Sequence, residues 1–345
     1  MKHARLADNP RRAIAAALSG EVAGIAVQTS GSAGAPREVL IGSDAMRASC
    51  AATTSRLGGP GAWLLAIPEE RIGGALVVAR ATLDGMPIAE LERGPFTVEA
   101  FAAAAATLAA EHSGRRYTSL VPTQVVRLSR SAQGRSALAT FDAILVGGAP
   151  LPPLGLDANL ISTYGATETC GGCVYDGVPL DGVLVAKSDD GHVRIAGATL
   201  AEGYADGDDS AFVTIDGTRW FETPDLGDWD GERLSIDGRA DDVIITGGLK
   251  AHPAGIEHAL NALSVVAEAA VVGVPDAEWG ERVTAFVVPT TASEIPSLGQ
   301  LRAALAPHLA PHELPRELWV IEQLPRTPGG KIDRRAMRTL ARGEE

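Results

Sequence analysis

Short apolar runs typical of strands alternate with alanine-rich stretches of helical pattern through the first half of the chain. No other feature of the sequence constrains the fold as strongly, because strands that alternate with helices predict a mainly parallel sheet covered on both faces. The expected strands are residues 24–28, 63–67, 119–121 and 143–146, and the expected helices are residues 97–111 and 124–130.

The remainder of the chain changes character twice. Residues 177–238 are rich in glycine and aspartate, and their short runs at 192–195 and 233–236 predict antiparallel strands and hairpins. Beyond Gly238 the pattern predicts a small α+β domain, with a boundary near Arg239–Asp242. Its expected helices are residues 253–263 and 298–306, and its expected strands are residues 267–274, 282–289 and 317–321.

Charge and cysteine content narrow the classes of function. The chain has 43 acidic and 30 basic residues, which give a net charge of −13. So negative a surface repels phosphate backbones and anionic lipid, and we expect no nucleic-acid partner. No apolar run reaches the length of about eighteen residues that spans a bilayer, so we expect no membrane insertion. The first ten residues lack the apolar core of a signal peptide, and three cysteines make no disulfide framework, which favours the cytoplasm. None of these features indicates the oligomeric state.

Residues 28–37 form a glycine- and hydroxyl-rich segment after the first expected strand. Glycines let successive backbone N–H groups point at one anion, hydroxyl groups add donors, and the Arg37 cation completes the charge match. The Walker A pattern is absent, and a plain polar surface loop has the same composition, so both interpretations stay open. The residues concerned are Thr29, Ser30, Gly31, Ser32, Gly34 and Arg37.

Residues 163–169 hold a second set of groups suited to a nucleotide. Tyr164 can stack on a base, Thr167 can donate to a phosphate, and the Glu168 carboxylate can bind a hard cation. The same segment is also an ordinary helix start with a carboxylate near its N-terminus.

Two later segments each contain one charged residue that has two interpretations. Asp225 suits a vicinal diol such as that of ribose, or else caps its own turn. Lys331 stands on a Gly/Pro-rich turn, residues 325–332, which is otherwise a solvated basic loop.

Taken in order with residues 238–250, these segments resemble the motifs of the adenylate-forming (AMP-binding) superfamily of acyl-CoA synthetases, from Thr29 to Arg334. The resemblance implies an α/β fold. A large N-terminal domain, residues 1–238, would contain parallel sheet layers and a small β-barrel-like subdomain, and a small mobile α+β domain would follow at residues 239–345. It also implies ATP, Mg²⁺ and CoA as cofactor and co-substrates, and a small-molecule carboxylic acid as the acyl donor.

The resemblance implies a role for each matching residue. Lys331 would be the catalytic lysine, Glu168 the Mg²⁺ ligand and Asp241 the hinge of the small domain. Gly247 and Gly248 would line the CoA tunnel. The ATP phosphates would meet Thr29, Ser30, Gly31, Ser32, Gly34, Arg37 and Thr167, and adenine and ribose would meet Gly147, Gly148, Ala149, Tyr164, Gly165, Asp225 and Arg239.

Two residues depart from the superfamily pattern. Arg37 stands where lysine is usual, which replaces a point charge by a planar fork. Arg71 stands where many members have a histidine near the acyl pocket.

Residues 164–183 look like the corresponding run of actinobacterial o-succinylbenzoate–CoA ligases, which act in menaquinone biosynthesis. This implies that o-succinylbenzoate is activated as an acyl adenylate and then transferred to CoA. We expect Gly172 and Cys173 to leave room for the aromatic acid, and Arg71 to bind its benzoate carboxylate as a bidentate fork. A solvent-exposed Arg71 beside two glutamates is the alternative.

Three other functions share these motifs. One is an acyl-CoA ligase for another aryl or fatty acid, because superfamily similarity does not fix a substrate. Another is an adenylation enzyme that loads a carrier protein. The last is a nucleotide-binding protein without catalysis, against which the retention of Glu168, Asp225 and Lys331 argues.

Overall fold

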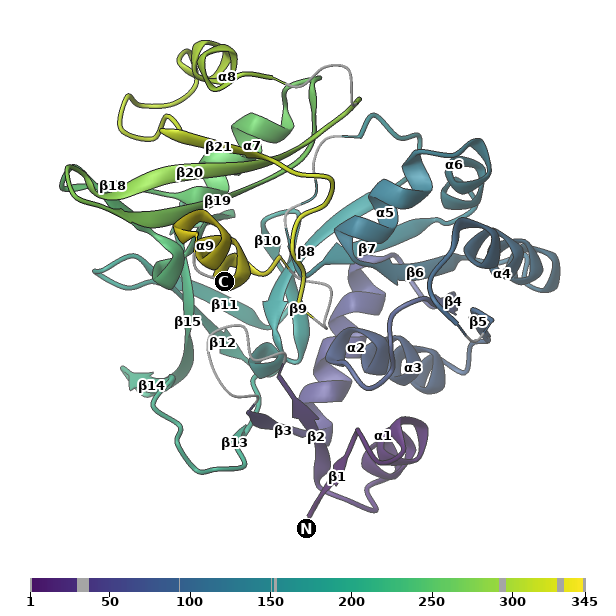
Figure 1. The fold of residues 1–345 in the computed structure, drawn as a ribbon. Helices are drawn as coiled ribbons and strands as arrows, with labels where there is room; N and C mark the ends of the chain where they lie inside the picture. The colour runs from purple at the N-terminus through teal and green to yellow at the C-terminus, as the bar shows by residue number, and fades with distance from the viewer. Residues whose placement is uncertain are drawn as a thin grey trace. The chain divides into compact units, whose positions relative to one another are not determined.

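The computed structural model describes residues 2–29, 37–92, 94–149, 151, 154–291, 296–327 and 332–343. They form two compact units (Figure 1). The first unit comprises residues 1–188, 194–223 and 229–234, and the second comprises residues 189–193, 224–228 and 235–345. The division falls within three strands, β12 (His192–Gly197), β15 (Thr218–Trp229) and β16 (Leu234–Arg239).

A seven-stranded sheet forms the centre of the first unit, in the order β10-β9-β8-β7-β6-β4-β5. Strands β5, β4, β6, β7 and β8 pair in parallel, whereas β9 and β10 are antiparallel. The parallel sheet expected from the alternating pattern is therefore confirmed. The strand bounds are β4 (Ala62–Leu65), β5 (Ile88–Glu90), β6 (Arg116–Leu120), β7 (Ala143–Gly147), β8 (Leu160–Ala166), β9 (Gly171–Tyr175) and β10 (Val178–Pro179).

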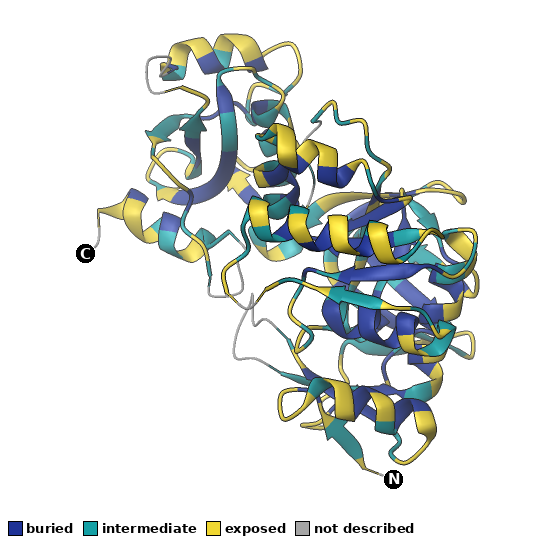
Figure 2. Ribbon diagram, turned by 90° about the vertical axis from the view of Figure 1, so that its right-hand side faces the viewer, coloured by how far each residue is buried: buried dark blue, intermediate teal, exposed yellow. Residues whose placement is uncertain are grey.

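Helices connect the parallel strands β4, β5, β6 and β7 along the chain. Helix α4 (Val98–Glu111) begins at Thr97, whose hydroxyl accepts a hydrogen bond from the backbone N–H of Ala100, and it buries Phe101 and Leu108 on one face. Figure 2 shows such helices with one buried and one exposed side. None of the helices within the described ranges has the length and apolar character to cross a bilayer. The other connecting helices are α3 (Ile72–Asp84), α5 (Pro122–Ser129) and α6 (Ala132–Leu138).

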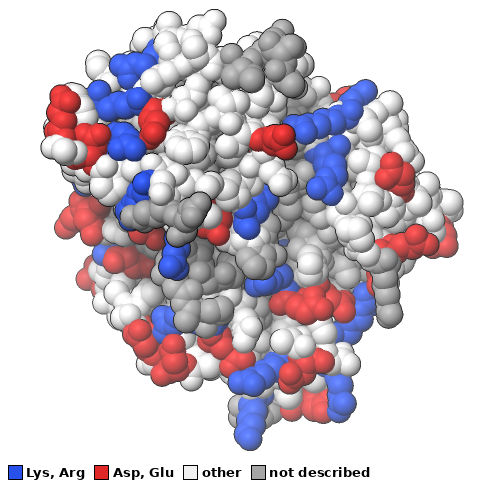
Figure 3. Space-filling view, viewed as in Figure 1, with Lys and Arg blue, Asp and Glu red and all other residues white. Residues whose placement is uncertain are grey.

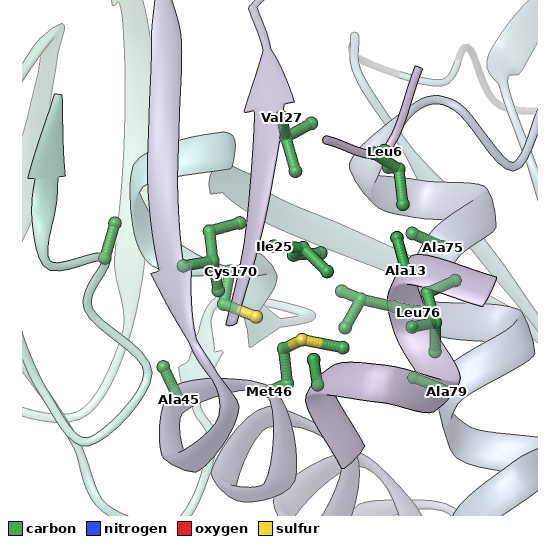
Figure 4. Close-up of a cluster of buried hydrophobic side chains, with 14 of the residues drawn as sticks. Leu6, Ala13, Ile25, Val27, Ala45, Met46, Ala75, Leu76, Ala79 and Cys170 are labelled. Carbon is green, nitrogen blue, oxygen red and sulfur yellow. The ribbon is translucent and has the colours of Figure 1, made fainter. Parts of the chain in front are cut away.

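A smaller sheet of the first unit has the order β1-β2-β3-β13. Its apolar side packs on helices and on Cys170, and Figure 4 shows Ile25 of β2, Met46 of α2 and Leu76 of α3 in this cluster. The elements are β1 (His3–Arg5), α1 (Pro10–Ser19), β2 (Gly24–Gln28), β3 (Glu38–Gly42), α2 (Ser43–Arg56) and β13 (Gly203–Tyr204).

The glycine- and aspartate-rich middle of the chain supplies a five-stranded sheet, in agreement with the strands expected there. Strands β11 (Val183–Lys187), β12, β15 and β14 (Phe212–Ile215) follow one another across it, and β16 pairs with β15. Strands β14 and β15 form an antiparallel hairpin.

A third arrangement, a five-stranded sheet between helices, makes up most of the second unit, as expected of an α+β domain. The middle of strand β19, residues 269–274, is apolar because both of its faces are covered: Val271 packs in a core with α7 and α8, whereas Val272 packs with Met337 of α9. The order is β18-β17-β20-β19, with β21 on β20. The elements are η2 (Ala240–Asp242), β17 (Ile244–Thr246), β18 (Leu249–Ala251), α7 (Pro253–Asn261), β19 (Val266–Asp276), β20 (Gly280–Pro289), α8 (Leu298–Leu305), β21 (Glu317–Val320) and α9 (Arg334–Arg342).

Candidate active site

The ends of β7 and β8 bring together two of the predicted nucleotide segments. Gly147, the last residue of β7, pairs with Thr163 of β8 in parallel register. A Cβ on Gly147 would lie 2.5 Å from Thr163 Oγ1, so a larger residue there would have to displace the Thr163 side chain. Gly148 follows in the left-handed region, with φ of +90°, and leads to Ala149. Open α/β sheets bind ligands beyond the carboxyl ends of their strands, and these residues lie at such an edge.

Strand β8 also carries Tyr164 and Gly165, the predicted base-side residues. The Tyr164 hydroxyl donates a hydrogen bond to Thr223 Oγ1 at 3.3 Å, which fixes the end of the side chain. A Cβ on Gly165 would lie 2.1 Å from the carbonyl oxygen of Gly171 on β9. The close approach of the two strands therefore requires glycine at this position.

The one-turn helix η1 (Thr167–Thr169) follows β8 directly and places Thr167 and Glu168 at the same edge. The Thr169 hydroxyl accepts a hydrogen bond from the backbone N–H of Ala166 at 2.8 Å and holds the turn closed. The phosphate-side threonine and the predicted metal-binding carboxylate are thus held on one short, capped element.

The Glu168 carboxylate is held by a buried tyrosine that sequence reasoning missed. Tyr204 donates its hydroxyl proton to Glu168 Oε1 at 2.9 Å. Burial and the neighbouring Glu168 charge raise the pKa of Tyr204, so its hydroxyl remains a donor at neutral pH. Glu168 Oε2 has no hydrogen bond to any described residue. One carboxylate with an oxygen to spare fits Mg²⁺, which proteins commonly hold through one or two carboxylates and the substrate phosphates.

Arg37, at the end of the predicted phosphate loop, is bound by acidic residues of the segment after β13. Its Nε and Nη2 donate to the Asp206 carboxylate at 2.9 and 2.7 Å, and Nη2 also donates to the Asp208 carbonyl at 2.6 Å. The bond from Arg37 lowers the pKa of Asp206. Thr29 and Arg37 close the two ends of the loop, because each backbone N–H donates to an oxygen of the other residue. Ser30, Gly31, Ser32 and Gly34 lie outside the described residues.

The predicted acid-side residues occupy two different surroundings. Gly172 and Cys173 lie on β9, and burial of the Cys173 thiol raises its pKa to about 12, which leaves a small uncharged side chain. A Cβ on Gly172 would lie 3.0 Å from Thr163 Cβ. Arg71, the residue before α3, is exposed and borders a hollow that Arg5 and Glu70 also line.

A second arginine, Arg80 in the middle of α3, is the most unusual charged residue of the first unit. Its side chain is only 3% exposed, its Nε has no hydrogen-bond partner, and no carboxylate of the described residues forms an ion pair with it. The guanidinium carbon lies 5.4 Å from the centroid of the Trp63 ring, and its charge lowers the pKa of the Cys50 and Cys170 thiols against the larger effect of burial. A buried cation without an anion is costly. The signal was present in the sequence as a lone charge inside the apolar run 75–81.

In the second unit, three predicted residues form a cluster of charges. Nε and Nη2 of Arg239 donate to the Asp241 carboxylate at 2.8 and 3.1 Å. Burial alone would raise the pKa of Asp241, but the hydrogen bond and the charge of Arg239 act against burial, and the pKa is lowered. That bond and the charge of Asp225 raise the pKa of Arg239. The predicted ribose-side residues and the predicted hinge are therefore neighbours.

Gly247 and Gly248 form the two-residue turn between β17 and β18. Their φ angles of +58° and +77° are left-handed, as the tightest hairpin turns require. A Cβ on Gly247 would lie 3.2 Å from the Trp279 ring, so the turn also has little lateral space. Lys331 lies outside the described residues, and the antiparallel bridge between Arg326 and Ile332 joins the chain on its two sides.

The chain is similar to known proteins over most of its length. The family described as the AMP-binding enzyme C-terminal domain matches residues 255–331. The chain is 41% identical over 330 residues to the probable 2-succinylbenzoate–CoA ligase of Mycobacterium tuberculosis. The aligned region covers 93% of this chain and 85% of the relative. The structure of this chain is similar to that of o-succinylbenzoate CoA synthetase from Bacillus subtilis in complex with the acyl-adenylate intermediate. The TM-score is 0.77 and the identity 25%, over 92% of this chain and 69% of that chain. The B. subtilis protein in complex with ATP and magnesium ion gives a TM-score of 0.76 at 25% identity, over 91% of this chain and 69% of that chain.

Proposed function

Since this chain belongs to the 2-succinylbenzoate–CoA ligase family of AMP-binding enzymes, we propose that it converts 2-succinylbenzoate to its CoA thioester at the expense of ATP. The reaction is that of an AMP-forming acid–thiol ligase. ATP and CoA are its co-substrates, Mg²⁺ is its metal, and its product belongs to menaquinone biosynthesis.

The first half-reaction forms an acyl adenylate. A carboxylate oxygen of the succinyl group attacks the α-phosphorus of ATP, a new P–O bond forms, and pyrophosphate leaves. Two anions must approach each other, so the site has to supply positive charge. Bound Mg²⁺ would offset the phosphate charge, and Glu168 is the residue that we assign to hold it. Lys331 would contact the reacting carboxylate and the α-phosphate.

The residues assigned to the nucleotide divide by chemistry. The backbone at Gly147–Ala149, Tyr164 and Gly165 would surround adenine, and Asp225 with Arg239 would bind the ribose hydroxyls. The phosphates would contact Thr167 and the loop that starts at Thr29 and ends at Arg37. Arg37 retains its Nη1 for this purpose, because that nitrogen donates to no described residue.

The second half-reaction transfers the acyl group. The sulfur of CoA attacks the acyl carbonyl, a C–S bond forms, the C–O bond to AMP breaks, and the thiol proton is released. Lys331 must first withdraw so that the turn at Gly247 and Gly248 can admit the thiol. Two steps with different requirements explain a movable small domain, which we assign to residues 239–345 against 1–238, with Asp241 as the hinge.

The observation that carries the choice of acid is the buried Arg80. 2-Succinylbenzoate has two carboxylates, and the one on the ring must be bound without reacting. A guanidinium can bind a carboxylate through two parallel hydrogen bonds. Arg80 Nε has no hydrogen-bond partner, and the Arg80 charge acts on Cys170, which directly precedes the strand that holds Gly172 and Cys173. Arg71, which is exposed and lines the hollow beside Arg5 and Glu70, remains a second candidate for binding the ring carboxylate.

The substrates also imply where the protein acts. ATP and CoA are available in the cytoplasm, and we assign the enzyme to that compartment. The face in Figure 3 shows acidic and basic side chains interspersed, and with a net charge of −13 we assign no nucleic-acid partner.

The experiment is pyrophosphate release with ATP and Mg²⁺ over a panel of acids, with and without CoA. The panel contains 2-succinylbenzoate, benzoate, a medium-chain fatty acid and an amino acid. We expect strong release with 2-succinylbenzoate and its thioester when CoA is added. If another acid of the panel is preferred, the reaction class stands and the assigned acid is wrong. If no acid supports release, the proposed function is wrong.

A further inference from the structure

Tyr204 connects the predicted metal-binding carboxylate to the segment between β13 and β14. Its hydroxyl donates to Glu168 Oε1 at 2.9 Å, and the backbone N–H of Ala201 donates to the Glu168 carbonyl at 2.8 Å. Glu168 is therefore held twice by residues 201–204, once at its backbone and once at its side chain. The single bond to Oε1 selects one orientation of the carboxylate and leaves Oε2 without a bond to described residues.

The Tyr204 ring is itself fixed on two sides. The guanidinium carbon of Arg37 lies 3.6 Å from the ring centroid, and Asp206 holds that guanidinium in a bidentate pair. Phe212 meets the ring edge-on, with centroids 5.7 Å apart at 61°. Stacking of this kind requires the planar guanidinium, which a lysine at position 37 would not provide.

The Tyr204 backbone is equally restrained. It pairs with Val39 on the antiparallel strand β3, and its N–H donates to Asp209 Oδ1 at 2.9 Å. With both ring and backbone fixed, the hydroxyl has one position, and that position is at Glu168.

We propose that Tyr204 is a positioning residue for the Mg²⁺–ATP complex: its hydroxyl holds Glu168 in the orientation that binds the metal, while Arg37, paired with Asp206, holds the Tyr204 ring. This inference rests on the proposed function. It also explains why an arginine stands at position 37: Arg37 links the end of the phosphate loop to the Glu168 carboxylate through the Tyr204 ring. Residues that orient metal ligands typically alter metal affinity by about 10–100-fold when they are replaced.

The test is metal binding in the absence of turnover. Mn²⁺ replaces Mg²⁺ and is titrated by electron paramagnetic resonance in the presence of the full chain and α,β-methylene-ATP, whose α–β linkage cannot be cleaved, so that no acyl adenylate forms. Tyr204→Phe keeps the ring and removes only the hydroxyl, so we expect the Kd of Mn²⁺ in this complex to rise about 10-fold. The affinity for the nucleotide without metal should not change. Tyr175→Phe is the matched control, because it removes another buried hydroxyl, which bonds Thr53 at 3.0 Å.

Further variants separate positioning from a loss of folding. Asp206→Asn removes an exposed charge, loosens the pair that holds Arg37, and should raise the same Kd by a smaller factor. Combining Tyr204→Phe with Glu168→Gln should add little to Glu168→Gln alone, because both act through one carboxylate. Mn²⁺ affinity of Tyr204→Phe within about twofold of the wild type would overturn the inference, as would full additivity in the double variant. If the folded wild-type protein bound no Mn²⁺ in the presence of the analogue, the proposed function itself would be wrong.

Discussion

Arg334 holds the Glu257 carboxylate with both Nη atoms, at 2.5 and 3.0 Å, and its Nε lies 3.1 Å from Asp242. One cation thereby joins α9, α7 and η2 in the second unit. The side chains of all three residues are at most 20% exposed. Arg334→Ala would leave the poorly hydrated Glu257 carboxylate without an ion pair and Asp242 with Arg338 alone, so we expect the free energy of unfolding to fall by about 3 kcal/mol, as measured by urea titration.

The neighbouring Arg335 provides the control. It lies on the same helix, its side chain is exposed, and it makes no hydrogen bond or ion pair with described residues. Arg335→Ala should change the free energy of unfolding by less than about 0.5 kcal/mol. Equal losses in the two variants would show that the charge cluster is not responsible.

The buried thiols predict a loss of stability at alkaline pH. Burial raises the pKa of Cys50 to about 11 and that of Cys173 to about 12, from an ordinary value of 9.0. Because the pKa values are higher in the folded state, their contribution to stability is complete below pH 9 and is lost as the pH rises from 9 towards 11 and 12. We expect the urea midpoint to fall over this range, and to fall less steeply in Cys50→Ala.

Alkylation tests the same property directly. At about pH 8.5, iodoacetamide should leave the native chain unlabelled and should label all its cysteines in urea, since only the thiolate reacts. Rapid labelling of the native chain would contradict the assigned burial.

The elements of the fold could be predicted where their pattern is local. The expected strand at 24–28 coincides with β2, and the expected helix at 97–111 differs from α4 by one residue. Helix α3 was not predicted, because its run from Gly73 to Ala79 is apolar on every side and shows no helical stripe.

The site could be predicted only as separate segments. Glu168 was identified, but its partner Tyr204 lies 36 residues away, and Arg37 meets Asp206 across 169 residues. No local spacing encodes such contacts, because β13 reaches β3 only once the sheet has formed. The composition of these segments indicates only that they suit a phosphate or a cation. The roles of single residues therefore came from the resemblance to the family and not from periodicity.

Lys331 is expected to act on the transition state. Lys331→Ala should slow adenylate formation about 10²–10³-fold, because it removes a cation from the point where charge develops. ATP affinity should change little, since a group used only in the transition state does not stabilise the ground state. Single-turnover quench experiments and calorimetry measure the two quantities. Lys2→Ala, which removes an exposed lysine far along the chain, is the control. Adenylate formation near the wild-type rate would remove Lys331 from the catalytic step.

Arg80 should affect the acid and not the nucleotide. A hydrogen bond to a charged group contributes about 1.5–3 kcal/mol, so Arg80→Met should raise the KM for 2-succinylbenzoate by about 10–100-fold. The KM for ATP should stay the same. An analogue without the ring carboxylate, 4-oxo-4-phenylbutanoate, has nothing to pair with Arg80, and the variant and the wild-type protein should use it equally well.

The same substitution should stabilise the protein when no acid is bound. In that state the Arg80 charge is buried and uncompensated, and methionine fills a similar volume without it. We therefore expect unliganded Arg80→Met to have a higher Tm than the wild type and to bind the acid more weakly. Residues that serve ligand binding often reduce stability in this way. A lower Tm with unchanged KM would make Arg80 a structural residue. Arg71→Ala decides between the two arginines: a rise in the KM for 2-succinylbenzoate there, and none in Arg80→Met, would place the ring carboxylate at the exposed start of α3.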